Sequence, residues 1–423
     1  GQRLELPQTA QFVPRESSLA VHLMVDPGRL PSFAEAVAKP ASRKIAGKEI
    51  GQIRDGMFAL AGLDYQDEVA DWLGNELSLT LFDSEQGKVE WVLALKSNDE
   101  NGAKRFLQHF WQVRSLAGTD VDITKYKGLG IISGRSAVLG RHIQEVSTAL
   151  VNQDFVLLAS HKEALQESLD VSQFPELNQF QDEDLGKIIK SFGTGEAVIT
   201  ASPRVFNSWL GMPLELSQRE DIDNLVTALK LKGQNIQIEG KLRFNKPISE
   251  FAINSYSGDF ALSSLNFAGG SSESLGVFSS SAKLLDVEDK HPISQWIGPL
   301  LRDQLSRVQN SLAAKTIFAL DQGPLVWLQQ REGWVFLTPF NNPPSTLVGE
   351  VLEAKGLLKS ALDSDNEHLE AWTRLVAKRN RSSESLETEV AVVLADQSDN
   401  VKWANSLSAF QQAKKVKALR PRL

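Results

Sequence analysis

The sequence predicts an α+β protein of duplicated units, each an antiparallel sheet with helices packed on one face. Apolar and polar residues alternate in segments such as 76–82, which predicts half-buried strands. A polar turn at 84–87 joins this segment to the next and favours a hairpin. Apolar residues at helical spacing, as in 98–114, predict helices that cover a sheet. A Trp-hydrophobic-Gly triplet recurs three times, which indicates duplication.

The first unit is expected over residues 1–190. Its predicted strands are 19–25, 76–82, 89–96, 124–133, 148–151 and 154–159. Asp26-Pro27 ends the first strand, because proline has no N–H for a strand ladder. Its predicted helices are 44–63, 67–73, 98–114 and 162–169. Asn98 or Asp99 is placed to cap the third of these helices.

The repeat is defined by three triplets of similar chemistry. They are Trp72-Leu73-Gly74, Trp209-Leu210-Gly211 and Trp296-Ile297-Gly298. Their unequal spacing argues against a regular solenoid or propeller and favours a full unit, an abbreviated unit and another full unit; chance recurrence is the competing explanation. We expect each tryptophan to be buried at the end of a helix, with its glycine at or just past that end in a left-handed conformation. Each triplet should precede strands of the same sheet order.

The remaining elements follow the same pattern. The abbreviated middle unit, 191–270, has predicted strands at 197–200, 225–231 and 236–244, and a Ser/Gly/Asn-rich connection begins at 251. The third unit, 271–423, has predicted strands at 277–285, 316–320, 325–329, 334–337 and 387–395. Its predicted helices are 345–358, 366–378 and 401–415, the last ending in a basic tail.

Composition excludes several classes of protein. The 423 residues are 42% hydrophobic and 23% charged, which is ordinary for a folded chain. A net charge of −8 argues against a nucleic-acid binder. The absence of cysteine excludes disulfides, thiolate metal sites and cysteine nucleophiles. No apolar stretch is long enough to span a bilayer. Because the chain opens on Gly1 rather than Met, we expect a natural N-terminal segment to precede it.

No motif assembles a catalytic, cofactor or metal site. The six histidines do not have metal-ligand spacing. Ser280-Ser-Ala-Lys283 fits S-x-x-K and Ser364-Asp-Asn366 supplies S-D-N, but the third penicillin-binding motif is absent. The serine of that chemistry opens a helix, whereas 277–285 is expected to be a strand. The glycine-rich 128–134 lacks phosphate-loop residues, and 363–374 lacks the glycine and glutamate of a calcium loop. We therefore expect a protein that is not an enzyme.

Nine tryptophans supply the candidate binding residues. Trp111, Trp327 and Trp334 are a possible partner surface, because aromatic anchors dominate interfaces; core packing is the alternative. Phe106, Leu107 and Phe110 share a helical face with Trp111. We expect the first three to be buried against the preceding hairpin and Trp111 to be partly exposed at its margin.

Several segments together resemble a known family. They are Phe12-Val-Pro14, Val25-Asp-Pro-Gly-Arg-Leu30, Trp72-Leu-Gly74, Trp91-Val-Leu-Ala-Leu-Lys96, Phe106-Leu-Gln-His-Phe-Trp-Gln-Val-Arg114, Ala117-Gly-Thr-Asp120, Tyr126-Lys-Gly128, Ala149-Leu-Val and Asp154-Phe-Val-Leu-Leu-Ala159. Over about residues 8–180 the chain resembles the cyanobacterial family of domain of unknown function 3352. The resemblance implies one N-terminal membrane anchor with the body outside the cytoplasm. It supplies no catalytic residues.

The leading functional hypothesis follows from these observations. We expect a non-catalytic, membrane-tethered protein of the periplasm or thylakoid lumen that acts through contacts with a membrane protein or complex, in assembly or maintenance of membrane complexes. The alternative is a module that binds a lipid or another apolar small ligand. The basic tail, with Lys414, Lys415, Lys417, Arg420 and Arg422, is either a solvated end or a contact with anionic lipid. We expect no cofactor, metal or nucleic acid.

Overall fold

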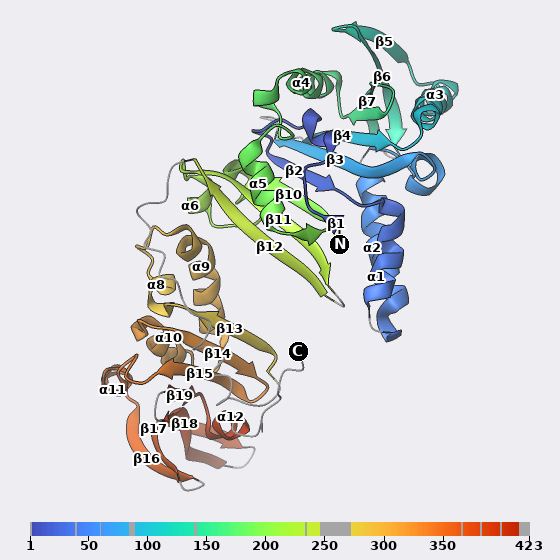
Figure 1. Cartoon of the computed structure of the whole chain (residues 1–423). Helices are drawn as coiled ribbons and strands as arrows, with labels where there is room; N and C mark the ends of the chain where they lie inside the picture. Colours follow the sequence, from blue (N-terminus) through green and yellow to red (C-terminus); the bar gives the residue numbers. More distant parts are fainter. Residues whose placement is uncertain are drawn as a thin grey trace. The chain divides into compact units, whose positions relative to one another are not determined.

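The structure is a computed structural model of the chain (Figure 1). It describes residues 2–38, 40–59, 61–83, 89–138, 142–232, 235–245, 272–364, 367–380, 383–397 and 400–413. The predicted turn at 84–87, most of the predicted connection from 251, and the basic tail from Lys414 lie outside these ranges. The chain divides into two compact units, Gly1–Pro247 and Ile248–Leu423, which are described separately.

The first unit is built on a sheet of ten strands in the order β12-β11-β10-β2-β3-β4-β8-β7-β6-β5. The strands are β2 (Leu19–Leu23), β3 (Leu73–Asp83), β4 (Val89–Ser97), β5 (Val121–Tyr126), β6 (Leu129–Val138), β7 (His142–Val151), β8 (Phe155–Ala159), β10 (Ala197–Ala201), β11 (Ile222–Lys232) and β12 (Asn235–Phe244). Every neighbouring pair is antiparallel. A separate small sheet pairs β1 (Gln2–Arg3) with β9 (Thr194–Gly195).

Helices and short helical turns connect these strands. They are η1 (Gln8–Phe12), η2 (Pro27–Arg29), α1 (Leu30–Val37), η3 (Pro40–Ser42), α2 (Arg43–Ala59), η4 (Tyr65–Val69), α3 (Glu100–Leu116), α4 (Lys162–Gln173), η5 (Pro175–Leu177), α5 (Glu183–Ser191), η6 (Pro203–Val205) and α6 (Leu214–Ser217). Asp99 caps α3 as predicted, since its side chain accepts a hydrogen bond from Asn101 N at 3.0 Å. Asp182 caps α5 in the same way.

Both faces of the first sheet bury apolar residues. Leu93 and Leu95 of β4 belong to a core that includes residues of α2 and α3, whereas Val92 and Ala94 belong to a second core with residues of α4. Successive strand residues point to opposite faces, so α3 and α4 cover opposite sides of the sheet. The predicted α+β class with antiparallel sheets is confirmed, and the structure adds a helical layer on the other face.

The aromatic stripe of α3 is largely as predicted. Phe106, Leu107 and Phe110 are buried in the core that includes the hairpin residues Leu77 and Leu95. The predicted partial exposure of Trp111 is wrong, because its side chain is only 6% exposed and its Nε1 donates a hydrogen bond to Thr148 Oγ1 at 2.8 Å. The sheet extends past the hairpin to β8 and β7, so α3 lies above the middle of a sheet and not at its margin.

The second unit contains a sheet of seven strands in the order β13-β14-β15-β19-β18-β17-β16. Its strands are β13 (Ser274–Phe278), β14 (Leu325–Gln330), β15 (Gly333–Pro339), β16 (Leu358–Ser364), β17 (Glu367–Asn380), β18 (Ser383–Gln397) and β19 (Asn400–Ala404). Its helices are α8 (Ser281–Leu285), α9 (Pro292–Arg307), α10 (Ser311–Leu320), α11 (Ser345–Ala354) and α12 (Leu407–Gln412). Residues of α9, α10 and α11 join one core, and residues of α12 join another.

The two sheets share one connectivity. In the first unit the order β2-β3-β4-β8-β7-β6-β5 corresponds strand for strand to the whole second sheet. A helix follows the third strand in both units (α3 and α11), and another follows the last strand (α4 and α12). Strands β10-β11-β12 repeat the first three strands once more, and β10 pairs with β2. The topology therefore supports duplication, and the predicted boundary after residue 190 falls inside the first unit.

The tryptophan triplets lie at equivalent places in the order of strands, but in different local structures. Each lies between the first strand of a repeat and the hairpin that pairs with it, as expected. Their local structures differ: Trp72 is buried beside η4, Trp209 is half-buried after η6, and Trp296 is half-buried inside α9. Of the three glycines, Gly211 alone has a positive φ, at 65°. The prediction of equivalent helix ends is therefore wrong.

Several elements of the second unit differ from the prediction because tertiary pairing overrides local pattern. Residues 366–378 were expected to be helical, but β17 pairs with β16 on one side and β18 on the other. Residues 401–404 form β19 between β15 and β18, so the last helix is shorter than expected. Residues 316–320 belong to α10 and not to a strand. Phe278 pairs with Leu325 at the start of β14, so the predicted strand stops there and α8 follows.

Candidate functional site

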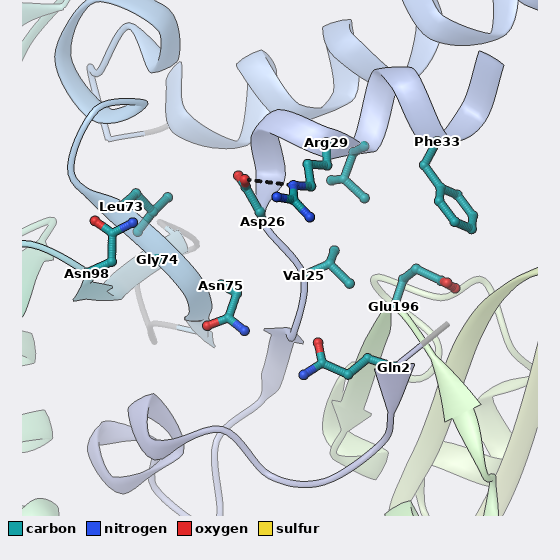
Figure 2. A pocket seen from close by; sticks show the side chains of 11 residues that line it. Gln2, Val25, Asp26, Arg29, Phe33, Leu73, Gly74, Asn75, Asn98 and Glu196 are labelled. Atoms are coloured by element: carbon teal, nitrogen blue, oxygen red, sulfur yellow. Dashed lines mark ion pairs between the residues drawn. The ribbon is translucent and has the colours of Figure 1, made fainter. Parts of the chain in front are cut away.

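A cavity of about 460 Å³ lies where β2 ends and β3 begins; we call it the first cavity (Figure 2). Its lining residues are Gln2, Val25, Asp26, Arg29, Leu30, Phe33, Leu73, Gly74, Asn75, Asn98 and Glu196. Its volume falls within the range of small-molecule sites in proteins. In Figure 2 the side chains of Val25 and Phe33 lie on one side of this space, and the amides of Asn75 and Asn98 lie on the other.

One wall of the first cavity forms where Asp26-Pro27 ends strand β2 and starts a turn. Pro27 ends β2, and the side chain of Asp26 accepts a hydrogen bond from Gly28 N at 2.8 Å, which starts the turn η2. Arg29 Nε then lies 3.6 Å from Asp26 Oδ2 (Figure 2). Glu196, which also lines the cavity, is 6% exposed, and its Oε2 accepts a hydrogen bond from Leu231 N at 2.7 Å.

These contacts define what the first cavity can do. Both of its carboxylates have partners: Asp26 accepts from Gly28 N and lies beside Arg29, and Glu196 accepts from Leu231 N. The apolar wall and the amide wall together suit a ligand with an apolar body and a polar end. The prediction missed this site, although the strand stop at Asp26-Pro27 marked one of its walls.

A second cavity, of about 220 Å³, lies on the other side of β10 from the apolar core of α3. Its lining residues are Arg15, Glu16, Ser17, Gln179, Thr200, Ala201, Ser202, Arg204, Ile222, Asp223, Asn224 and Asn245. Four of its polar side chains are more than nine-tenths buried, namely those of Ser17, Gln179, Thr200 and Asn224. Asn224 Oδ1 has no hydrogen-bond partner. Unpaired buried acceptors are uncommon in folded proteins, so Asn224 Oδ1 is a position where a donor in the cavity can bind.

A buried hydrogen-bond chain ends at the floor of the second cavity. Thr9 Oγ1 lies 2.7 Å from Ser78 Oγ, which lies 2.8 Å from His22 Nδ1. His22 Nε2 lies 2.8 Å from Gln179 Oε1. The side-chain amide of Gln179 donates to Ser17 Oγ at 3.3 Å and to Thr200 Oγ1 at 3.1 Å. The chain spans β3, β2 and β10.

His22 is neutral within this chain of hydrogen bonds. Complete burial lowers its pKa to about 4, and the hydrogen bond to Gln179 opposes that shift only in part. Ser78, His22 and Gln179 resemble a nucleophile–base–orienter arrangement, but His22 and Ser78 are both fully buried, so no substrate reaches them. The residues that bond to His22 lie far from it in the sequence. Only the alternation of Ala20, His22 and Met24 along the predicted strand 19–25 could have indicated that the histidine is buried.

The predicted partner surface of Trp111, Trp327 and Trp334 is corrected by burial. Trp111 is buried as described above. Trp334 is fully buried, stacks on Phe336 at a centroid distance of 4.4 Å, and donates from Nε1 to Gln309 O at 2.7 Å. Trp327 is half-buried and packs edge-on against Phe318 and Phe336. The structure does not bring the three together; they complete the two apolar cores, because an indole with a satisfied N–H packs well inside a protein.

The S-x-x-K segment has a structural role. Ser280, the serine of the motif, is the N-cap of α8, so this serine does open a helix and the expectation of a strand through 285 is wrong. Its neighbour Ser281 is fully buried, and Ser281 Oγ lies 2.8 Å from Phe318 O and 3.1 Å from Asp321 Oδ2. Burial raises the pKa of Asp321 to about 7, against smaller opposing effects of Ser281 and Gly323. A serine has one hydrogen to donate, so a protonated Asp321 completes both contacts. Lys283 is exposed, and Asp365 and Asn366 of the S-D-N motif lie outside the described residues.

The edge strand β12 exposes its apolar side. Ile236 and Ile238 are 59% and 67% exposed. Through the register of β11, β10 and β2 they share one sheet face with half-buried apolar residues. We call this surface the open face; its members are Ile199, Leu231, Ile236 and Ile238, and it adjoins Val21 and Leu229, which pack against the core of α3.

The polar residues of β12 point the other way. Glu239 pairs with Lys230 at 2.6 Å, and Lys241 donates to Ser191 Oγ of α5 at 2.5 Å. Arg243 pairs with Asp182, the cap of α5, at 2.8 Å. The usual alternation of an antiparallel sheet, apolar inward and polar outward, is therefore reversed on this strand.

Two further features of the molecule concern metal ions and membranes. Within the described parts of the chain, no group of three or more His, Asp or Glu side chains could hold a metal ion. In the same ranges, no helix is both long enough and apolar enough to cross a membrane.

Comparison with known proteins places the chain in a family. It belongs to the family described as protein of unknown function DUF3352, which it matches over residues 1–421, well beyond the 8–180 that carry the resemblance. No curated protein matches it. It is similar to TP0453 in crystal form I, with a TM-score of 0.30 and 11% identity, covering 62% of this chain and 87% of that chain. For crystal form IV of TP0453 the values are 0.29, 11%, 53% and 76%. TM-scores this low support no functional argument.

Proposed function

We propose that this chain is a non-catalytic protein that acts by direct contact with a partner protein. The observation that carries the proposal is the open face, where an edge strand presents two isoleucines outward and its charged residues inward. Exposed apolar patches of this kind mark interaction sites in soluble proteins. Charged side chains often protect edge strands from pairing with other proteins. On β12 the two outward positions 236 and 238 hold isoleucine instead of a charged residue.

The setting of this contact is the second part of the proposal. The resemblance to the cyanobacterial family supports a membrane-tethered body in the periplasm or thylakoid lumen, where the partner is a membrane protein or complex. In that setting the protein serves assembly or maintenance of membrane complexes. A tether raises the effective concentration of the open face near other membrane proteins, so a patch of modest area suffices for binding.

The test compares two exposed isoleucines on opposite edges of the same sheet. Ile238→Lys places a charge on the open face, whereas Ile123→Lys places the same charge on β5, where Ile123 is 71% exposed. Full-length, membrane-anchored protein is cross-linked and recovered from membranes. We expect Ile238→Lys to lose a partner that both wild type and Ile123→Lys retain. Equal recovery by all three proteins contradicts the proposal.

A second candidate function rests on the first cavity. Its apolar lining residues Val25, Leu30, Phe33 and Leu73 favour binding of a lipid or another apolar small ligand. Native mass spectrometry of protein purified from membranes checks this: a bound apolar molecule in wild type should be lost in Phe33→Ser. Phe174→Ser, a change at a 46% exposed position outside the cavity, should retain it. Absence of the molecule from wild type removes this candidate.

A further inference from the structure

The floor of the second cavity has a defined hydrogen-bond polarity. The amide of Gln179 donates to Ser17 and Thr200, so its Oε1 is the acceptor for His22. His22 Nε2 must then carry the proton, and Nδ1 accepts from Ser78. Ser78 in turn accepts from Thr9. Every hydrogen bond in this series therefore has its donor on the side of Thr9 and its acceptor on the side of the cavity.

This polarity decides what the cavity offers to a ligand. Ser17 Oγ and Thr200 Oγ1 each accept from Gln179, so each hydroxyl keeps its own hydrogen to donate. Both oxygens accept from the same nitrogen, at 3.3 and 3.1 Å, so both hydroxyls lie at the floor of the cavity beside Gln179. Within the described residues, neither hydroxyl hydrogen has another acceptor.

The matching acceptor stands on the neighbouring strand. Asn224 lies on β11, two residues before Val226, the partner of Thr200 in the β10–β11 ladder, and therefore on the same side of the sheet as Thr200. Its side chain is 6% exposed and its Oδ1 has no partner. An unpaired buried acceptor costs free energy, which a ligand N–H or O–H recovers. A ligand between Thr200 and Asn224 must therefore offer an acceptor to Thr200 and a donor to Asn224.

The charges of the lining balance. Arg15 and Arg204 stand against Glu16 and Asp223, and Arg243 is also paired with Asp223. Arg15 Nε donates to Asn178 O at 3.0 Å, and Arg204 donates to Glu16 O at 3.1 Å, so backbone carbonyls hold both guanidinium groups in place. The formal charges of the lining residues sum to zero, with two basic and two acidic side chains.

We propose that the second cavity is a binding site for a neutral carboxamide group. Its carbonyl oxygen accepts hydrogen bonds from Ser17 and Thr200, and its N–H donates to Asn224 Oδ1. A carboxamide has two lone pairs on oxygen and a donor on the adjoining nitrogen, which matches this set. The cavity of about 220 Å³ holds a small group, such as an N-acetyl group of a sugar or a terminal amide of a peptide.

The direct test is a nuclear magnetic resonance titration of the whole chain with acetamide and with acetate, which have nearly the same shape. We expect acetamide to shift the side-chain amide signals of Gln179 and Asn224 saturably, and acetate to bind at least about tenfold more weakly, since it cannot donate to Asn224. N-acetylglucosamine and N-acetylglycinamide then distinguish a sugar from a peptide source. Equal affinity for acetate, or no saturable shift with acetamide, overturns the proposal.

Variants separate recognition from folding. Thr200→Val removes one donor with little change of shape, and we expect a loss of about three- to tenfold in acetamide affinity. Ser17→Ala provides the same readout if Thr200→Val does not fold. Ser133→Ala is the control, because Ser133 is a buried hydroxyl on β6 that bonds Ser147 and does not line the cavity. Unchanged affinity in a folded Thr200→Val or Ser17→Ala protein contradicts the site.

Discussion

The two units share a strand order but differ in what has been added to it. The second sheet ends at β13, whereas the equivalent strand β2 of the first sheet is extended by β10, β11 and β12. The first cavity includes Glu196 beside β10, the second cavity includes Thr200 and Asn224, and the open face ends on β12. The second cavity and the open face therefore lie largely on the added strands, whereas the first cavity lies mainly beside β2 and β3 of the repeated framework and reaches the added strands at Glu196.

The units also differ in the buried ionisable group whose pKa is shifted most. The first holds a neutral histidine, His22, whose pKa falls to about 4. The second holds Asp321, whose pKa rises to about 7. Both shifts arise mainly from burial, but they have opposite signs because histidine gains charge on protonation and aspartate loses it. The two units should therefore respond to pH in opposite directions.

The largest expected effect is on the core of the first unit. Phe110 is 1% exposed between Phe106 and Trp111, so Phe110→Ala should destabilise this unit by about 3–5 kcal/mol through the cavity it leaves. Val113→Ala, at a 47% exposed position of the same helix, should cost less than about 0.5 kcal/mol. Urea denaturation of both variants measures the difference. A change below about 1 kcal/mol for Phe110→Ala would place the stripe outside the core.

The pH response of the second unit should be the next largest. Below pH 3.8, Asp321 is protonated whether folded or unfolded, and its burial costs little. As pH rises toward 7, the unfolded chain releases the proton first, so the unit loses up to about 4 kcal/mol of stability. Asp321→Asn should remove this loss at pH 8 and change little at pH 4. Hydrogen exchange of peptides from each unit reports the effect, with Asp303→Asn, a surface change, as control.

The first unit should show a smaller response of the opposite sign. Above pH 6.5, His22 is neutral in both states, and its contribution to stability is fully present. As pH falls from 6.5 to 4, the unfolded chain binds a proton that the folded chain does not, which costs about 3 kcal/mol. The same hydrogen-exchange experiment should show weaker protection of the first unit at pH 4.5 and a flatter profile in His22→Gln. Parallel pH profiles for the two units would contradict the comparison.

The sequence predicted what local periodicity determines. The stripe of Phe106, Leu107 and Phe110 repeats with the turn of one helix, and its burial follows from that pattern alone. The α+β class and the hairpins followed from short alternating segments for the same reason. Residues 367–380 were misread because their Glu, Ala, Arg and Lys content favours a helix, while two neighbouring strands hold them extended.

Local periodicity in the sequence could not predict the candidate sites. Gln179 reaches His22 across 157 residues of sequence, and Asn224 meets Thr200 only because β10 and β11 pair. No local pattern connects these positions. Tryptophans were chosen as partner residues for their chemistry, but Trp111 and Trp334 are buried with satisfied indole N–H groups. The exposed isoleucines of β12 had a strand pattern that gave no sign of which side faces outward.

The proposed role of the added strands is tested most directly by photo-cross-linking from the open face. A photoreactive amino acid is placed at position 238 in the full-length, anchored protein, and at position 123 as the control on the opposite edge. If the open face binds a partner, irradiation of membranes should give one defined adduct from position 238 and none from 123. The same adduct from both positions, or none from 238, would contradict the role assigned to β10–β12.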